Sequence, residues 1–66
     1  MNYVNGSDLQ QGRTYRCISM GDGTIVNNGE VYLATDQQDR KENRLVVNTA
    51  SGAAAYATPT SVWSEV

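Results

Sequence analysis

Apolar and polar residues alternate in two short segments, each of which follows a glycine: residues 14–20 after Gly12 and residues 31–36 after Gly29. A period of two is typical of a half-buried β-strand, and glycine permits the turn that precedes it. In both segments the alternation begins with a tyrosine three residues after the glycine. We therefore expect a turn followed by a β-strand at each place.

The first of these expected strands has two unlike faces. Tyr15 and Cys17 lie on one face, and Arg16 lies on the other. Because a charged side chain favours water, we expect the face with Tyr15 and Cys17 to point into the core. Cys17 is then a buried structural thiol and not a nucleophile, since reactive cysteines need an exposed, electropositive setting.

Three further strands are expected in the second half of the chain. Residues 44–49 have the strongest β-propensity, residues 53–58 are too few to form a helix between a glycine and a proline, and residues 62–66 follow a break. Residues 36–43 are all polar and are expected to form a long, exposed hairpin loop. Five short strands must curl to bury one face each, so we predict an all-β fold, a small five-stranded, partly open barrel.

The size of the chain and its lack of histidine narrow the possibilities further. A length of 66 residues suits a single domain, residues 1–66, with a thin core, and residues 1–8 are expected to be a flexible N-terminal segment. One cysteine cannot form an intramolecular disulfide, and without histidine a conventional zinc site is not available. The chain shows no signal peptide and no apolar stretch of membrane-spanning length. We expect no metal, no cofactor and no membrane partner.

Residues with catalytic chemistry form no recognisable motif. General acid–base and nucleophilic catalysis need a group that exchanges protons near neutral pH or an activated nucleophile. The seven carboxylates are dispersed through loops, and the glycine-rich residues 21–24 lack the Gly-Lys-Ser/Thr sequence of a phosphate-binding loop. We therefore predict that the protein is not an enzyme and assign no catalytic residue.

The aromatic residues point to protein binding. The chain has four tyrosines and one tryptophan but no phenylalanine, and tyrosine and tryptophan are enriched where apolar surfaces meet water. Tyr15, Tyr32 and Trp63 are expected to fill the core. A protein-binding patch is then expected from four other residues: Tyr3, Met20, Ile25 and Tyr56. An open barrel edge offers a second route, through strand addition or formation of a homodimer.

The basic residues provide an alternative site for nucleic acid. They are Arg13, Arg16, Arg40, Lys41 and Arg44. The formal charge of the chain is −2, which opposes binding to phosphates, and acidic residues are interleaved with the cluster at 40–44. Nucleic acid is therefore the less favoured partner.

The order of the motifs resembles that of small Src-homology-3-like β-barrel accessory proteins of bacteriophages, over about residues 9–66. The segments that carry the resemblance are 12–18 (GRTYRCI), 29–32 (GEVY), 44–47 (RLVV), 51–52 (SG) and 63–65 (WSE). The resemblance implies a non-enzymatic protein in the cytoplasm of an infected bacterial cell that binds and modulates a host or phage protein. A minor structural subunit of a phage assembly is the other role that it implies.

Overall fold

The computed structural model describes residues 3–20 and 26–66 of the chain. The described residues form one short 3-10 helix and six strands, so the predicted all-β class is confirmed. In chain order the elements are β1 (Tyr3–Asn5), η1 (Gly6–Asp8), β2 (Thr14–Ser19), β3 (Val31–Gln38), β4 (Arg44–Asn48), β5 (Ala54–Ala57) and β6 (Val62–Glu65).

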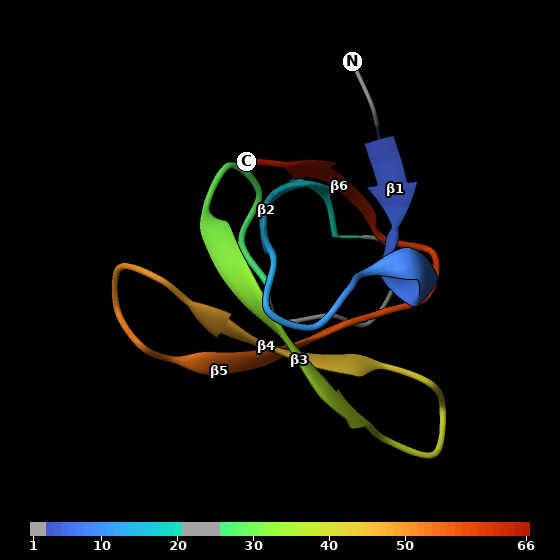
Figure 1. Cartoon of the computed structure of the whole chain (residues 1–66). Coiled ribbons are helices and arrows are strands. Elements are labelled where there is room, and N and C mark those ends of the chain that lie inside the picture. The colour runs from blue at the N-terminus through green and yellow to red at the C-terminus, as the bar shows by residue number, and fades with distance from the viewer. Residues whose placement is uncertain (1–2, 21–25) are drawn as a thin grey trace.

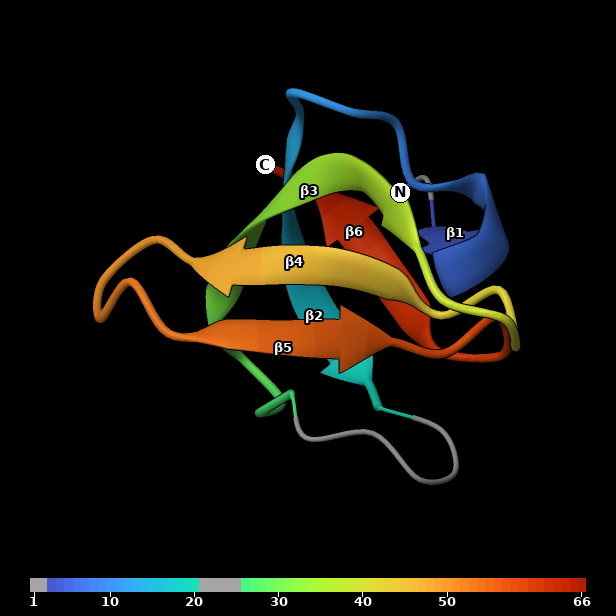
Figure 2. The ribbon, with the colours of Figure 1, turned by 90° about the horizontal axis from the view of Figure 1, so that it is seen from below.

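The six strands form a single antiparallel sheet in the order β1-β6-β2-β3-β4-β5. Figure 2 shows β4 and β5 in front of β2 and β6, while β3 curves from one layer to the other. The register between β3 and β4 shifts between Ala34 and Gln38, and such irregularities let a strand bend. The sheet is thus strongly curled around its core, but β1 and β5 remain its two edges and do not pair in the described part of the chain.

The N-terminal residues correct the expected strand count from five to six. Residues 3–5 form β1 and pair with β6, although the sequence analysis placed them in a flexible segment (Figure 1). Only Val4 of this short strand packs against the core, which is too little for a recognisable hydrophobic pattern. The strand continues into Gly6, which is buried and whose N–H donates to the carbonyl of Ser61 at 2.8 Å. Tertiary pairing, and not local propensity, therefore determines this element.

The core contains the three aromatic residues that were predicted to fill it. Tyr15, Tyr32 and Trp63 are buried, and so is Cys17, two residues after Tyr15 on the same face of the strand, which confirms the inward face of β2. The Tyr15 hydroxyl accepts a hydrogen bond from the backbone N–H of Gln10 at 3.1 Å. The buried apolar side chains among the described residues are Leu9, Tyr15, Cys17, Val26, Tyr32, Ala34, Val46, Ala55, Ala57 and Trp63.

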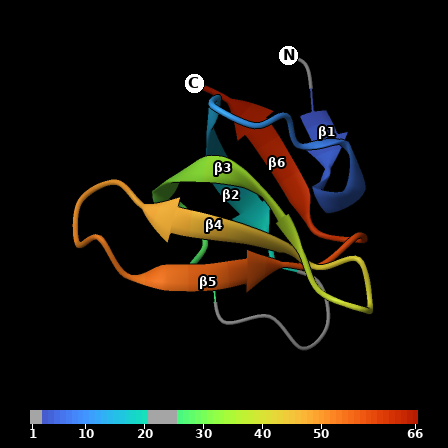
Figure 3. The same ribbon diagram turned by 60° about the horizontal axis from the view of Figure 1, so that its bottom comes forward.

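The hairpin between β3 and β4 is shorter than the loop that the polar residues 36–43 predict. β3 continues to Gln38, and the connection turns at Asp39, whose carboxylate accepts hydrogen bonds from the backbone N–H groups of Lys41 and Asn43 at 2.9 and 3.0 Å. Figure 3 shows this hairpin extending beyond the rest of the sheet. Polar residues continue the strand here because the hairpin arm projects past the core and has water on both faces.

Candidate functional site

The four residues predicted to form a protein-binding patch are not brought together as one group. Tyr3 is 51% exposed on β1 and Tyr56 is 42% exposed on β5, but these strands are opposite edges of the sheet (Figure 1). Met20 is exposed just after β2, and its carbonyl accepts a hydrogen bond from the Thr58 hydroxyl, just beyond β5. Ile25 and the glycine-rich residues 21–24 lie outside the described residues. Tyr56 and Met20 are therefore on neighbouring elements, and Tyr3 is apart from them.

Tyr56 belongs to an apolar surface that crosses three strands. We define the outer apolar face as the outward side chains of β3, β4 and β5, which are Leu33, Leu45, Val47, Ala54 and Tyr56. Leu33 lies opposite Val47, Val47 opposite Ala54, and Leu45 opposite Tyr56. Directly opposed side chains on one face of an antiparallel pair are in contact range, so the five residues form a continuous surface.

The exposure of this face is high for large apolar side chains. Leu33 is 38% exposed, comparable to Tyr56, and Leu45 and Val47 are half-buried. Of these residues, only Tyr56 was predicted from the sequence to belong to a binding patch. The missed signal is that residues 45–47 are apolar at every position, which places apolar groups on both faces of β4.

The five basic residues proposed for nucleic acid are distributed over separate elements, and two of them are held by the protein. Arg13 donates to Glu65 at 2.6 Å, and this hydrogen bond and the negative charge of Glu65 raise the pKa of Arg13. Arg44 is half-buried and donates from Nη1 to the carbonyl of Thr35 at 2.8 Å. The other three are exposed, Arg16 on β2 and Arg40 and Lys41 in the hairpin between β3 and β4. The exposed basic side chains therefore lie at two separate places, on β2 and in the hairpin between β3 and β4.

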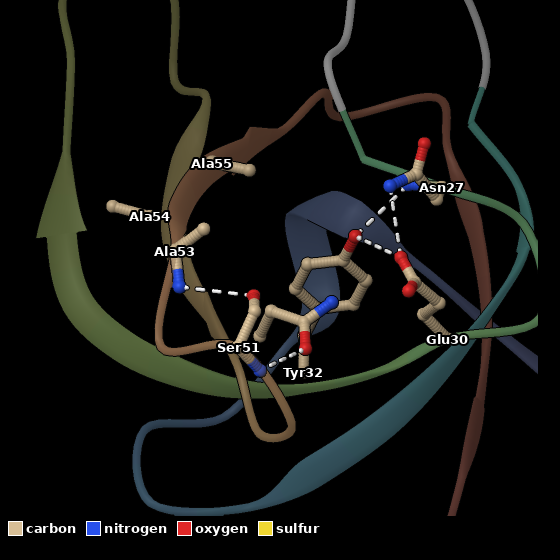
Figure 4. A pocket seen from close by; sticks show the side chains of 8 residues that line it. Asn27, Glu30, Tyr32, Ser51, Ala53, Ala54 and Ala55 are labelled. Atoms are coloured by element: carbon tan, nitrogen blue, oxygen red, sulfur yellow. Dashed lines mark hydrogen bonds between the residues drawn. The ribbon is translucent and has the colours of Figure 1, made fainter.

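A pocket of about 300 Å³ lies at the end of the sheet where β4 turns into β5. Figure 4 shows alanine side chains on one side of this pocket and the ring of Tyr32 on the other. Its lining residues come from the segment before β3, from β3, from the end of β4, from the β4–β5 turn and from the start of β5: Asn27, Glu30, Tyr32, Asn48, Ser51, Ala53, Ala54 and Ala55. None of these residues was predicted as part of a site, because the segments that meet here are distant in sequence.

The Glu30 carboxylate is fixed at one end of this pocket by two hydrogen bonds. Asn27 donates from Nδ2 to Oε2 of Glu30 at 2.8 Å, and the Tyr32 hydroxyl donates to the same oxygen at 3.4 Å. The Tyr32 hydroxyl in turn accepts from the backbone N–H of Asn27 at 2.9 Å (Figure 4). Tyr32 is therefore a core residue whose polar end orients a carboxylate at the surface.

The Cys17 side chain is buried, in agreement with its predicted structural role. Its Sγ–H points to Oδ1 of Asn28 at 3.6 Å, and burial raises the pKa of the thiol. A protonated thiol is a poor nucleophile and a poor metal ligand. Across residues 3–20 and 26–66, no group of three or more histidine, cysteine, aspartate or glutamate residues is arranged to hold a metal ion. No helix in the same part of the chain is long and apolar enough to cross a membrane.

Comparison of the chain with protein-family models, with curated proteins and with solved structures finds no match.

Proposed function

We propose that the chain is a non-enzymatic protein-binding module that binds another protein through the outer apolar face. The observation that carries this proposal is the continuous apolar surface formed by opposed residues of three adjacent strands, with Leu33 and Tyr56 as its most exposed large members. A contiguous apolar surface of this kind is the usual mark of an interaction site. Tyrosine is also enriched among the residues that dominate binding energy at protein interfaces.

The resemblance in the sequence gives this module its proposed biological setting. In this proposal the curled sheet is a Src-homology-3-like barrel with one added strand, and the protein is a bacteriophage accessory protein. It acts in the cytoplasm of the infected bacterial cell by binding and modulating a host or phage protein. The order of the sequence motifs supports this setting, and the antiparallel curled sheet is compatible with it.

The test is affinity capture from bacterial lysate, repeated with matched variants and after nuclease treatment. The variant Leu33→Thr/Tyr56→Thr removes the exposed apolar groups of the outer apolar face and keeps a residue with high β-propensity. The control is Ile18→Thr, because Ile18 is 42% exposed on β2, outside this face. We expect a partner that is retained by the wild type and by the control but lost by the double variant. Retention of the same partner by the double variant contradicts the proposal.

Nucleic-acid binding is the alternative proposal, in which Arg16, Arg40 and Lys41 contact phosphates. The pairing of Arg13 with Glu65 and the burial of Arg44 argue against a site that uses all five basic residues. Capture that disappears on nuclease treatment supports this alternative. A further alternative is a minor structural subunit of a phage assembly, for which stable self-association at micromolar concentration, measured by sedimentation, is the expected sign.

A further inference from the structure

The pocket beside the β4–β5 turn contains a hydrogen-bond donor that no other described residue uses. Asn48 is only 5% exposed, and its Oδ1 accepts from the backbone N–H groups of Ala50 and Ser51 at 2.9 and 3.0 Å. Two N–H donors require an oxygen at that position, so the orientation of the amide is fixed by its partners. The Nδ2 group of Asn48 therefore points the other way, and it donates no hydrogen bond to any of residues 3–20 and 26–66.

This donor is still accessible from the pocket. In the described part of the chain, Arg44 Nε is the one fully buried side-chain nitrogen or oxygen without a hydrogen-bond partner. The Nδ2 of Asn48 is therefore not fully buried, and Asn48 lines the pocket. A buried side chain that presents an unused N–H to a cavity is suited to an occupant with a carbonyl oxygen.

The opposite end of the pocket presents an unused acceptor with a negative charge. Both donors to Glu30 act on Oε2, which leaves Oε1 without a partner in the described part. No arginine or lysine of that part pairs with Glu30, since the ion pair present there joins Arg13 to Glu65. Among the described residues that line the pocket, Glu30 is the only charged one. This end is therefore complementary to a cation.

The distance between the two ends is set by the length of Tyr32. The backbone of Tyr32 lies opposite Asn48 in the sheet, and its hydroxyl bonds to Glu30, so the side chain spans the pocket from the donor end to the acceptor end. The wall facing it is formed by the methyl groups of Ala53 and Ala55, whereas the methyl group of Ala54 points away from the pocket (Figure 4). The pocket is thus apolar between its two polar ends.

We propose that this pocket binds a lysine residue of a protein partner. An extended lysine side chain has about the length of a tyrosine side chain, so its ammonium reaches Oε1 of Glu30 while its own peptide carbonyl accepts from Asn48 Nδ2. The methylene groups then lie against the alanine wall. Lysine fits better than arginine, because a guanidinium binds a carboxylate best through both oxygens and Oε2 of Glu30 is already used. A volume of about 300 Å³ suits one residue.

The inference extends the proposed protein-binding function but is tested without the partner. The probe is Nα-acetyl-lysine methylamide, added to the ¹⁵N-labelled protein and followed by two-dimensional NMR. We expect saturable shifts at the side-chain amide of Asn48 and at the backbone amides of residues 53–55. Nα-acetyl-norleucine methylamide, which lacks the ammonium, and 1,5-diaminopentane, which lacks the carbonyl, should both bind at least about threefold more weakly.

Two variants and a control locate the binding. Glu30→Gln removes the negative charge but keeps an oxygen that accepts from Asn27 and Tyr32. This variant should bind Nα-acetyl-lysine methylamide about threefold more weakly, or weaker still. Ala53→Leu fills the pocket without changing charge and should abolish the shifts. Glu42→Gln makes the same charge change in the turn at the opposite end of β4, and binding should be unchanged.

Three results overturn the inference: no saturable shift with the blocked lysine, equal binding of the norleucine probe, or equal weakening by Glu42→Gln. The last would show attraction to the net negative chain and not to the pocket. None of these results bears on capture through the outer apolar face, so the failure of one proposal is distinguishable from the failure of the other.

Discussion

Tyr32 and Trp63 meet edge to face in the core, with ring centroids 5.6 Å apart and ring planes at 89°. The two residues come from β3 and β6, so this contact joins two strands that are not neighbours in the sheet. Each also carries a polar group that must be satisfied in a buried position. The Tyr32 hydroxyl donates to the carboxylate of Glu30 at the edge of the pocket, and the Trp63 indole N–H donates to the hydroxyl of Ser61 at 2.7 Å. The core and the candidate site are therefore connected through one aromatic pair.

Replacement of Ser61 should destabilise the fold through Trp63. The Ser61 hydroxyl accepts from the indole and donates to the carbonyl of Thr58 at 2.6 Å, and Ser61 is fully buried. Ser61→Ala leaves the buried indole N–H without this partner, which typically costs about 1–3 kcal/mol, whereas the Thr58 carbonyl still accepts from the backbone N–H of residue 61 at 3.1 Å. Urea unfolding followed by tryptophan fluorescence measures the loss. Ser64→Ala, at a half-buried position on β6, is the control and should have a much smaller effect.

Replacement of Gly6 should detach the N-terminal strand from the sheet. A methyl group at this position would clash with the backbone carbonyl of Thr58 and with the hydroxyl of Ser61. The carbonyl belongs to the main chain and cannot rotate away, so Gly6→Ala should lower the free energy of unfolding by about 1–3 kcal/mol or more. Hydrogen exchange should show lost protection at the amides that pair β1 with β6. Ser7→Ala, at the exposed next position, should leave both quantities unchanged.

Strands with a period of two were predictable from the sequence, because alternation distinguishes the buried Tyr15 and Cys17 from the exposed Arg16 without knowledge of the fold. β1 was not, because its three residues contain one core side chain, Val4, and pair only with a strand at the other end of the chain. The outer apolar face depends on the strand order, since Leu33 and Tyr56 become parts of one surface only when β4 lies between β3 and β5.

The pocket could not be predicted from the sequence. It needs the β4–β5 turn beside the segment that precedes β3, and it needs Asn48 to turn its oxygen toward the backbone of that turn. Local sequence indicates a turn at residues 50–52 but says nothing of which segment packs against it. Long-range packing therefore determines the candidate site, whereas local alternation determines most of the strands that carry it.

The hairpin between β3 and β4 should lose stability in acid. Hydrogen bonds from the side chain and backbone of Asn43 and from the backbone of Lys41 lower the pKa of Asp39 in the folded state. A carboxyl group whose pKa is lower in the folded state stabilises the fold above its unfolded pKa, and this contribution is lost as the pH falls through the folded pKa. The decline should therefore begin near the ordinary aspartate pKa of about 4 and continue below it.

Asp39→Asn isolates this contribution, because the amide oxygen still accepts from the backbone while the titrating charge is gone. We expect the stability of the variant to depend less on pH below about pH 4 than that of the wild type, as measured by thermal unfolding at a series of acidic pH values. Asp8→Asn is the control, since Asp8 lies in η1, far along the chain from the hairpin. An identical acid profile for wild type and Asp39→Asn would contradict the assignment.

The thiol of Cys17 should react only when the core opens. The Cys17 side chain is fully buried on the inner face of the sheet, and its Sγ–H points to Asn28. Because burial also raises the pKa of the thiol, both the access of reagents and the thiolate fraction are low. Labelling with 5,5′-dithiobis(2-nitrobenzoic acid) at pH 8 should be at least about a hundredfold slower in buffer than in guanidinium chloride, because reaction requires an opening of several kcal/mol. The variant Gly6→Ala, which loosens β1 against β6, should raise the native rate, since β6 pairs with β2 directly opposite Cys17. Fast labelling of the wild-type protein in buffer would show instead that Cys17 is accessible without opening of the sheet.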